Sequence, residues 1–267
     1  MHLPSLIAAC VLTLAMLAGC ASTSTAPHER TSTADRGILF RTVTVKGQAH
    51  RYAVYVPWSY DPAKPNPTIV FLHGSGECGT DGQKQAVVGL GNNAMFRPKQ
   101  YPFIIVFPQK PDENQEWEAY DDLVMATLDA TRREFTCDAS RTYLTGLSQG
   151  GHGTWTIGSL HPDVWAALAP VCSYGSPRRQ PTQGVDTSDA TVASKVKHLP
   201  IWAFHGGKDD VVPIQGVKDL IAAVKAAQTQ GDPEPKLTIF PEANHNAWDP
   251  AYGGENVGDW LLQHTKQ

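Results

Sequence analysis

A five-residue pattern, Gly146-Leu147-Ser148-Gln149-Gly150, constrains the fold of this chain more than any other feature of its sequence. It directly follows the short apolar segment 142–145 and leads into a run of small residues, which predicts a strand, a tight turn and a helix. Glycines two positions before and after the serine let the backbone crowd its neighbours. The pattern therefore predicts that Ser148 is held out on a strained turn as a nucleophile. The alternative is an ordinary turn whose serine caps the helix.

A serine nucleophile needs a base and an orienting carboxylate, and candidates for both follow later in the chain. The apolar segment 199–204 runs into a polar turn that carries Asp209 and Asp210, and the spacing does not choose between these two acids. His245 lies in the loop that leaves the predicted strand 236–240. Its imidazole suits the role of base because an unperturbed pKa of about 6.5 lets it accept and return a proton near neutral pH.

The other histidines are expected to be structural. His73 and His205 each precede a glycine at the end of a predicted strand, where a hydrogen bond to the backbone is typical. His152 would stand one turn behind Ser148 on the same helix, where packing is the expected role. Those that fall at a helix end or in segments predicted to be tail, edge or surface are His161, His28, His50, His198 and His264.

A glycine-rich loop, residues 73–79, follows the predicted strand 68–72 and can direct backbone N–H groups toward the serine. The expected donors for a developing oxyanion are the amide of Ser75 in this loop and the amide of Gln149. A phosphate-binding loop is the alternative for such a turn. It is disfavoured because the segment has no G-x-x-x-x-G-K-[ST] match and carries Glu77 and Asp81, which would repel phosphate.

Four sequence blocks carry a resemblance to the α/β-hydrolase superfamily over about residues 38–264. They are HGSGECGTD at 73–81, RTYLTGLSQGGHGTW at 141–155, HGGKD at 205–209 and HNAWDPAY at 245–252. More narrowly, the chain resembles the esterase-like "predicted peptidase" and dienelactone-hydrolase-related group. This resemblance implies that the acid is Asp209, four residues after the strand-end histidine. The sequence departs from the group at Cys78 and Gln149, where arginine and methionine are usual.

The alternation of predicted strands and helices indicates an α/β fold, with a mostly parallel central sheet and helices on both faces. Further expected strands lie at 43–45, 52–56, 103–107 and 166–169, and expected helices at 121–135 and 217–227. The polar segment 173–197 is expected to be either an inserted cap or a disordered surface loop. The hydrophobic content of 41% is ordinary for one globular domain.

The N-terminal residues suggest export. The apolar run 6–18 has the length of a secretory signal segment, and the following Leu17-Ala18-Gly19-Cys20 resembles a bacterial lipobox with Cys20 as the lipidated residue. Residues 1–20 are therefore expected to be a signal peptide, 21–37 a flexible tether and 38–267 the catalytic domain. The expected result is a membrane-anchored lipoprotein, and simple cleavage that releases a periplasmic or secreted protein is the alternative.

Cofactors and nucleic acid are not expected. Cys78, Cys137 and Cys172 show no zinc-ligand spacing, and one disulfide among them has three pairings that the sequence leaves open. We therefore expect no metal. The formal net charge of −4 provides no basic surface for nucleic acid.

Three functions follow from these predictions. The first is a carboxylic-ester hydrolase with an acyl-serine intermediate, acting on a small-molecule or polysaccharide-linked ester. The others are a serine peptidase of the prolyl-oligopeptidase-like type on the same fold and a non-catalytic surface lipoprotein. Aromatic residues that could wall a substrate pocket are Trp117, Tyr120, Tyr174 and Trp248.

Overall fold

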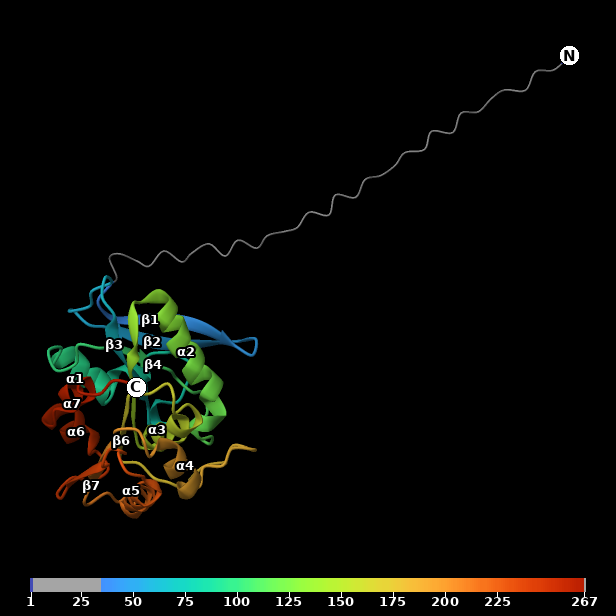
Figure 1. The fold of residues 1–267 in the computed structure, drawn as a ribbon. Coiled ribbons are helices and arrows are strands. Elements are labelled where there is room, and N and C mark those ends of the chain that lie inside the picture. Colours follow the sequence, from blue (N-terminus) through green and yellow to red (C-terminus); the bar gives the residue numbers. More distant parts are fainter. Residues whose placement is uncertain (2–34, 267) are drawn as a thin grey trace.

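One mixed sheet organises the part of the chain that the computed structural model describes, which is Met1 and residues 35–266. Its eight strands lie in the order β1-β2-β4-β3-β5-β6-β7-β8 (Figure 1). The strands are β1 Gly37–Val45, β2 Gln48–Val56, β3 Asn66–Leu72, β4 Ile104–Phe107, β5 Cys137–Leu147, β6 Ala167–Val171, β7 Trp202–Gly206 and β8 Lys236–Phe240. Residues 2–20 of the expected signal peptide, with Cys20, and most of the tether lie outside the described residues.

Pairing within the sheet follows the sequence pattern. The alternating strands β1 and β2 form an antiparallel hairpin, and β2 pairs antiparallel with β4. All pairings from β4 onward are parallel, so the expectation of a mostly parallel sheet is confirmed. Pairing between β6 and β7 is the sparsest: Val171 faces Phe204, and a separate bridge joins Leu168 to Ile201.

Helices connect the parallel strands and cover the sheet on both sides. The α-helices are α1 Leu90–Phe96, α2 Asp121–Glu134, α3 Gln149–Leu160, α4 Asp189–Val196, α5 Gln215–Ala227, α6 Trp248–Gly254 and α7 Val257–Leu262. Three short 3-10 helices add to these: η1 Ser75–Glu77, η2 Lys84–Val87 and η3 Trp117–Tyr120. Figure 1 shows α1, α6 and α7 grouped together and apart from α2.

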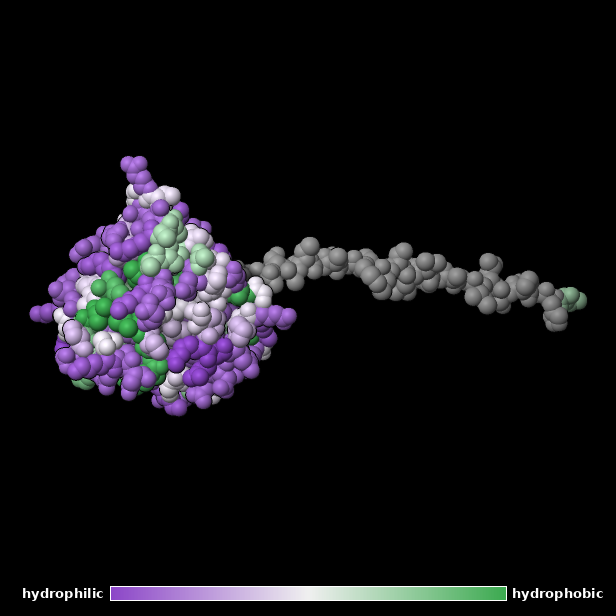
Figure 2. Space-filling model, turned by 90° about the horizontal axis from the view of Figure 1, so that it is seen from below, coloured by the Kyte–Doolittle hydropathy of each residue, from purple (hydrophilic) through white to green (hydrophobic). Residues whose placement is uncertain are grey.

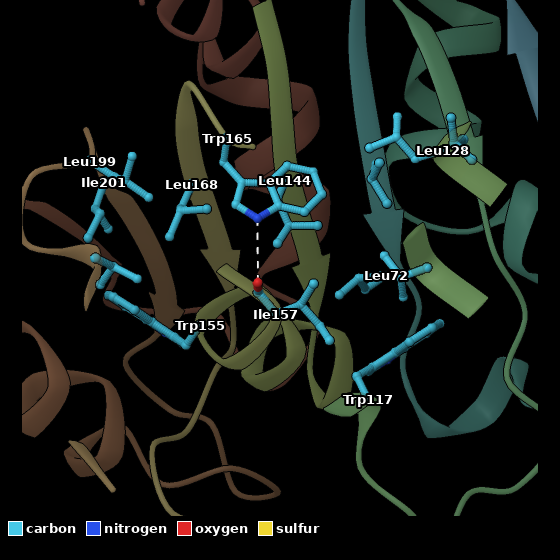
Figure 3. Close-up of a cluster of buried hydrophobic side chains, with 14 of the residues drawn as sticks. Leu72, Trp117, Leu128, Leu144, Trp155, Ile157, Trp165, Leu168, Leu199 and Ile201 are labelled. Atoms are coloured by element: carbon cyan, nitrogen blue, oxygen red, sulfur yellow. Dashed lines mark hydrogen bonds between the residues drawn. The ribbon is translucent and has the colours of Figure 1, made fainter. Parts of the chain in front are cut away.

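Two hydrophobic cores lie on the two faces of the sheet. Strand β3 contributes Val70 and Leu72 to one core and Ile69 and Phe71 to the other, as the alternation of side chains along a strand requires. The first core packs against α2, α3, α4 and α5, and the second against α1, α6 and α7. Figure 3 shows the first core, where Nε1 of Trp165 donates to the carbonyl of Ile157 at 3.4 Å. Such burial on both faces explains the continuous apolar runs of the central strands.

The structure of segment 173–197 differs from the expectation of an inserted cap or a disordered loop. Its second half is neither a cap of its own nor disordered, because residues 189–196 form α4. Ser188 caps this helix by accepting a hydrogen bond from the Thr191 amide, and Val192 and Val196 bury one face in the first core. The apolar residues at i and i+4 were the signal, which the polar composition of the whole segment obscured.

The surface of the domain is mixed in polarity. Figure 2 shows hydrophilic residues over most of one face, with hydrophobic residues reaching the surface between them. In the described part of the chain, no helix is both long and apolar enough to span a membrane.

Candidate active site

Ser148 sits on a sharp turn between β5 and α3. Its backbone has φ 55° and ψ −116°, and its amide donates to the carbonyl of Val171 at 2.9 Å. A non-glycine residue rarely adopts a positive φ, so the surrounding structure must hold this conformation. Gly150 makes it possible, because a Cβ at that position would lie 1.9 Å from the carbonyl oxygen of Leu72. A Cβ at Gly146 would lie 2.3 Å from the carbonyl oxygen of Gly150.

A chain of hydrogen bonds joins Ser148 to two residues from distant loops. The Oγ of Ser148 lies 2.9 Å from Nε2 of His245, in the loop after β8. On the other side of the ring, Nδ1 of His245 lies 2.8 Å from Oδ2 of Asp209, in the loop after β7. These distances are those of well-formed hydrogen bonds. The parallel strands therefore bring a hydroxyl, an imidazole and a carboxylate together at their carboxyl ends.

The structure distinguishes Asp209 from its neighbour. The carboxylate of Asp209 has no exposed surface, and its Oδ1 accepts from the amides of Val211 and Val212 at 3.0 and 2.8 Å. Asp210 is exposed. Nε2 of His205 lies 3.3 Å from Oδ2 of Asp209 and 3.0 Å from the carbonyl of Val212. His205 thus has the expected bond to the backbone and, in addition, a contact with the carboxylate that the sequence did not reveal.

The loop after β3 lies beside Ser148. A Cβ at Gly74 would be 3.5 Å from Cβ of Ser148, so the amide of Ser75 is close to the same side chain. His73 holds the base of this loop: its Nδ1 bonds to the carbonyl of Gly74 at 2.6 Å, and its Nε2 accepts from the Lys110 amide at 3.2 Å. Complete burial lowers the pKa of His73 to about 3, which keeps the ring neutral. Its expected structural role is confirmed.

Gln149 contributes a free backbone amide and a side chain that holds a neighbouring segment. As the first residue of α3 its amide has no intrahelical acceptor, so it can serve a group bound near Ser148. Its side-chain Nε2 donates to the carbonyls of Glu113 and Gln115, at 3.2 and 3.0 Å. This fastens the segment before η3 to the turn that carries Ser148. Gln180 joins the same segment through its amide, which donates to the carbonyl of Asn114.

The aromatic residues expected to wall a substrate pocket lie in different environments. Trp117 is completely buried, with its Nε1 bonded to the carbonyl of His73 at 3.1 Å, so its expected place in the wall of a substrate pocket is wrong. It fills the space that the missing side chain of Gly153 leaves. Trp248 is partly exposed and packs edge-on against His245, with ring centroids 5.3 Å apart. Tyr174 is largely buried and stacks on His152 at 4.7 Å.

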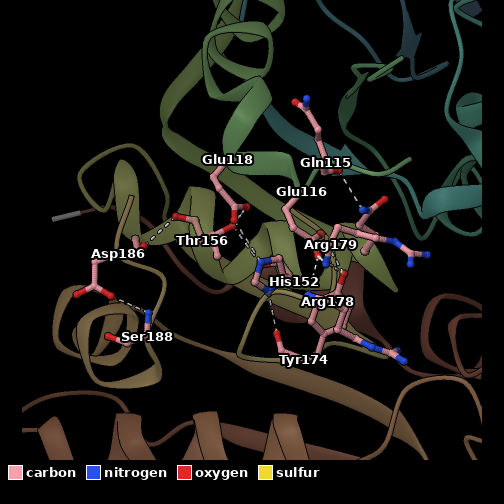
Figure 4. A network of polar contacts seen from close by, with 12 residues as sticks. Gln115, Glu116, Glu118, His152, Thr156, Tyr174, Arg178, Arg179, Asp186 and Ser188 are labelled. Atoms are coloured by element: carbon pink, nitrogen blue, oxygen red, sulfur yellow. Dashed lines mark hydrogen bonds and ion pairs between the residues drawn. The ribbon is translucent and has the colours of Figure 1, made fainter. Parts of the chain in front are cut away.

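A buried carboxylate, Glu116, was not identified from the sequence. Its oxygens accept from the hydroxyl of Tyr174, at 3.1 and 3.0 Å, and from the amides of Arg178 and Arg179, at 3.0 and 2.9 Å (Figure 4). It therefore fixes the backbone of the segment that follows β6. An isolated glutamate between a glutamine and a tryptophan carries no pattern that marks it as buried, so only the tertiary structure reveals this role.

His152 does more than pack. Its Nδ1 lies 3.1 Å from the carbonyl of Tyr174, and its Nε2 lies 3.6 Å from the carboxylate of Glu118 (Figure 4). Burial alone would lower the pKa of His152, but the neighbouring Glu118 carboxylate more than offsets that effect and raises it. Helix α3, which follows Ser148, is thereby linked to η3 by a buried polar pair.

Comparisons with known proteins agree with this geometry. No family model matches the chain. A Yersinia pestis protein named as a carboxymethylenebutenolidase is 27% identical over 137 residues, 48% of this chain and 48% of that protein. A crystal structure of a thermostable esterase superposes with a TM-score of 0.69 at 26% identity, over 85% of this chain and 63% of that one. This chain has the α/β-hydrolase fold.

Other relatives of this α/β-hydrolase also carry esterase names. Feruloyl esterase B of Neurospora crassa is 27% identical over 169 residues, 56% of this chain and 53% of that protein. A ferulic acid esterase of Anaeromyces mucronatus, solved with ferulic acid, shares the fold with a TM-score of 0.65 at 17% identity, over 89% and 94% of the two chains. The α/β-hydrolase spans about half the length of the first curated relatives it matches. These names support a carboxylic-ester hydrolase.

Proposed function

We propose that this α/β-hydrolase is a serine esterase in which Ser148, His245 and Asp209 act as a catalytic triad. The hydrogen-bonded chain from Ser148 Oγ through His245 to Asp209 carries the proposal. Esterase names among the relatives favour an ester over a peptide as the substrate. The whole assignment depends on a serine that is held in a strained turn and within hydrogen-bonding distance of its base.

The roles follow from the positions of the protons. With Nδ1–H of His245 donating to Asp209, Nε2 is free to accept the hydroxyl proton as Ser148 Oγ attacks the ester carbonyl. The imidazolium formed is stabilised by the buried carboxylate. When the tetrahedral intermediate collapses, Nε2–H gives this proton to the departing alcohol and leaves an acyl-serine. Water then repeats the sequence: its oxygen bonds to the acyl carbon as its proton goes to Nε2, the bond from the acyl carbon to Oγ breaks, Oγ recovers the proton, and the free acid leaves.

The amides of Ser75 and Gln149 are proposed as the oxyanion hole. Both belong to segments that flank Ser148, one at the start of η1 and the other at the start of α3. Fixed N–H donors stabilise the negative charge that develops on the carbonyl oxygen without needing to reorganise. This charge is absent from the ester itself, so the two amides favour the transition state over the ground state.

The proposed substrate is a small-molecule or polysaccharide-linked carboxylic ester. Trp248 offers an aromatic surface next to His245, which suits a flat acyl or alkoxy group. Aromatic acids occur in two of the structural neighbours, one solved with ferulic acid and one with sinapinate. Activity assays with methyl ferulate, p-nitrophenyl acetate and a chromogenic peptide panel would compare an aromatic ester, a short acyl ester and peptides as substrates.

Ser148→Ala tests the nucleophile. The variant should lose ester turnover and labelling by a fluorophosphonate, because no other hydroxyl is paired with His245 in the described structure. Ser194→Ala, a change on the exposed face of α4, is the matched control and should keep both. Labelling that persists in a folded Ser148→Ala protein would refute the assignment. Cleavage of peptides but not of esters by the wild-type enzyme would identify a peptidase instead.

A further inference from the structure

Cys172 contacts the backbone of His245, the base of the proposed triad. It follows β6, has a positive φ of 50°, and its amide donates to the carbonyl of Phe204 at 2.9 Å. Its side chain is buried, and the thiol donates to the backbone carbonyl of His245 at 3.0 Å. The proposed ester chemistry uses no thiol, so this residue has no role in it.

Three different metal-binding donors converge at this point. The Sγ of Cys172, a carboxylate oxygen of Asp209 and a ring nitrogen of His245 all lie within 4.8 Å of one another. We propose that these three side chains form an inhibitory binding site for a soft divalent cation such as Zn²⁺ or Cd²⁺. The proposed ion is an inhibitor of the enzyme and takes no part in ester hydrolysis.

The donor set fits such an ion. Thiolate, imidazole and carboxylate are the common zinc ligands, with bond lengths of about 2.0 to 2.3 Å, and three protein ligands leave a fourth position for water. Donors around one tetrahedral ion are therefore about 3.4 Å apart. Nδ1 of His245 and Oδ2 of Asp209 are 2.8 Å apart, so these two must separate slightly while the thiol moves closer.

Binding at Nδ1 explains the inhibition. The ion replaces the proton on Nδ1, which moves to Nε2, so the imidazole stays neutral; the thiol proton leaves to solvent as the sulfur binds. Nε2 then carries a hydrogen and can no longer accept the proton of Ser148. Asp209 is also removed from its hydrogen bond with the ring. The inhibition rests on the proposed esterase function, whereas the binding of the ion does not.

Cadmium binding gives a readout that does not depend on activity. Titration of the wild-type protein with Cd²⁺ should produce an ultraviolet thiolate-to-cadmium absorption band with a stoichiometry of one ion, in step with the loss of esterase activity. Excess chelator should reverse both. Cys172→Ser keeps a hydroxyl donor for the His245 carbonyl but removes the thiolate, so it should lose the band and raise the inhibitory Cd²⁺ concentration at least about tenfold.

Cys78→Ser is the matched control, since Cys78 is the other free thiol that the structure describes near the site, in the loop after β3. The Cys78→Ser variant should keep the cadmium absorption band, and Cd²⁺ should inhibit its esterase activity to the same extent as in the wild type. Loss of the band in Cys78→Ser, or its persistence in Cys172→Ser, would overturn the proposal. Cys172→Ala repeats the test if the serine variant does not fold. Failure of the esterase proposal would appear separately, as turnover that survives in Ser148→Ala while the cadmium band is unchanged.

Discussion

At the scale of single residues, the environment decides which of two adjacent acids can bind the ring of His245. Asp209 is buried, accepts two backbone amides and contacts two imidazoles, whereas Asp210 is exposed. Residue spacing left this choice open, and the resemblance to a known family resolved it in favour of the residue that the structure brings to His245. The contact of His205 with Asp209 could not be anticipated, because it depends on the turn that folds the chain back after β7.

Asp209→Asn should lower kcat by a factor on the order of 10⁴, because an amide next to Nδ1 favours the tautomer in which Nε2 carries the proton. Asp210→Asn should change kcat less than about threefold, since its side chain is exposed and the hydrogen bonds of the His245 ring in the described structure go to Asp209 and Ser148. Steady-state kinetics with p-nitrophenyl acetate would measure both. Equal losses in the two variants would transfer the role away from Asp209.

At the scale of secondary-structure elements, the apolar pattern predicted most strands and helices well. Residues 236–240 match β8 exactly, and residues 121–135 match α2 to within one residue. The pattern failed where burial is set by contacts between distant segments. Trp117 is buried because Gly153 leaves room for its ring, and Glu116 is buried because it binds amides more than 60 residues away. No local signal in the sequence reports either contact.

Close packing between β3 and the start of α3 gives an element-scale prediction. Gly150→Ala should destabilise the domain by at least about 3 kcal/mol, because the new Cβ would overlap the Leu72 carbonyl and neither backbone can easily move. Gly254→Ala is the control: nothing lies within 4 Å of its Cβ position, so its effect should stay within about 1 kcal/mol. Denaturant unfolding compares the two. Wild-type stability in Gly150→Ala would contradict the close approach.

At the scale of the whole molecule, the α/β-hydrolase fold brings residues from three separate loops to one end of the sheet. Whether this domain is attached to a membrane is a separate question. In the described part of the chain, no helix could span a bilayer. We propose that acyl chains on Cys20 provide the attachment, since each buried methylene contributes about 0.8 kcal/mol and several chains together hold a protein stably.

Expression with the native leader in a lipoprotein-processing bacterium would test this anchor. The wild-type protein should partition into the detergent phase, and Cys20→Ala should either shift mature protein into the aqueous phase or leave the precursor uncleaved. Mass spectrometry of the N-terminus would identify the modification. A wild-type protein that is wholly aqueous and begins with an unmodified residue between 18 and 37 would instead indicate a secreted or periplasmic enzyme.

The sparsely paired boundary between β6 and β7 lies between the strand that leads to Ser148 and the strands that lead to Asp209 and His245. Ser148 follows β5, on one side of this boundary, whereas Asp209 and His245 follow β7 and β8, on the other. Five facing residue pairs join β7 to β8, whereas one facing pair, Val171 with Phe204, and one separate bridge join β6 to β7. Thermal separation of β6 from β7 would lengthen the hydrogen bond between Ser148 and His245, and the hydrogen bond between His245 and Asp209 would remain. Activity would then be lost on warming before the acid–base couple itself comes apart.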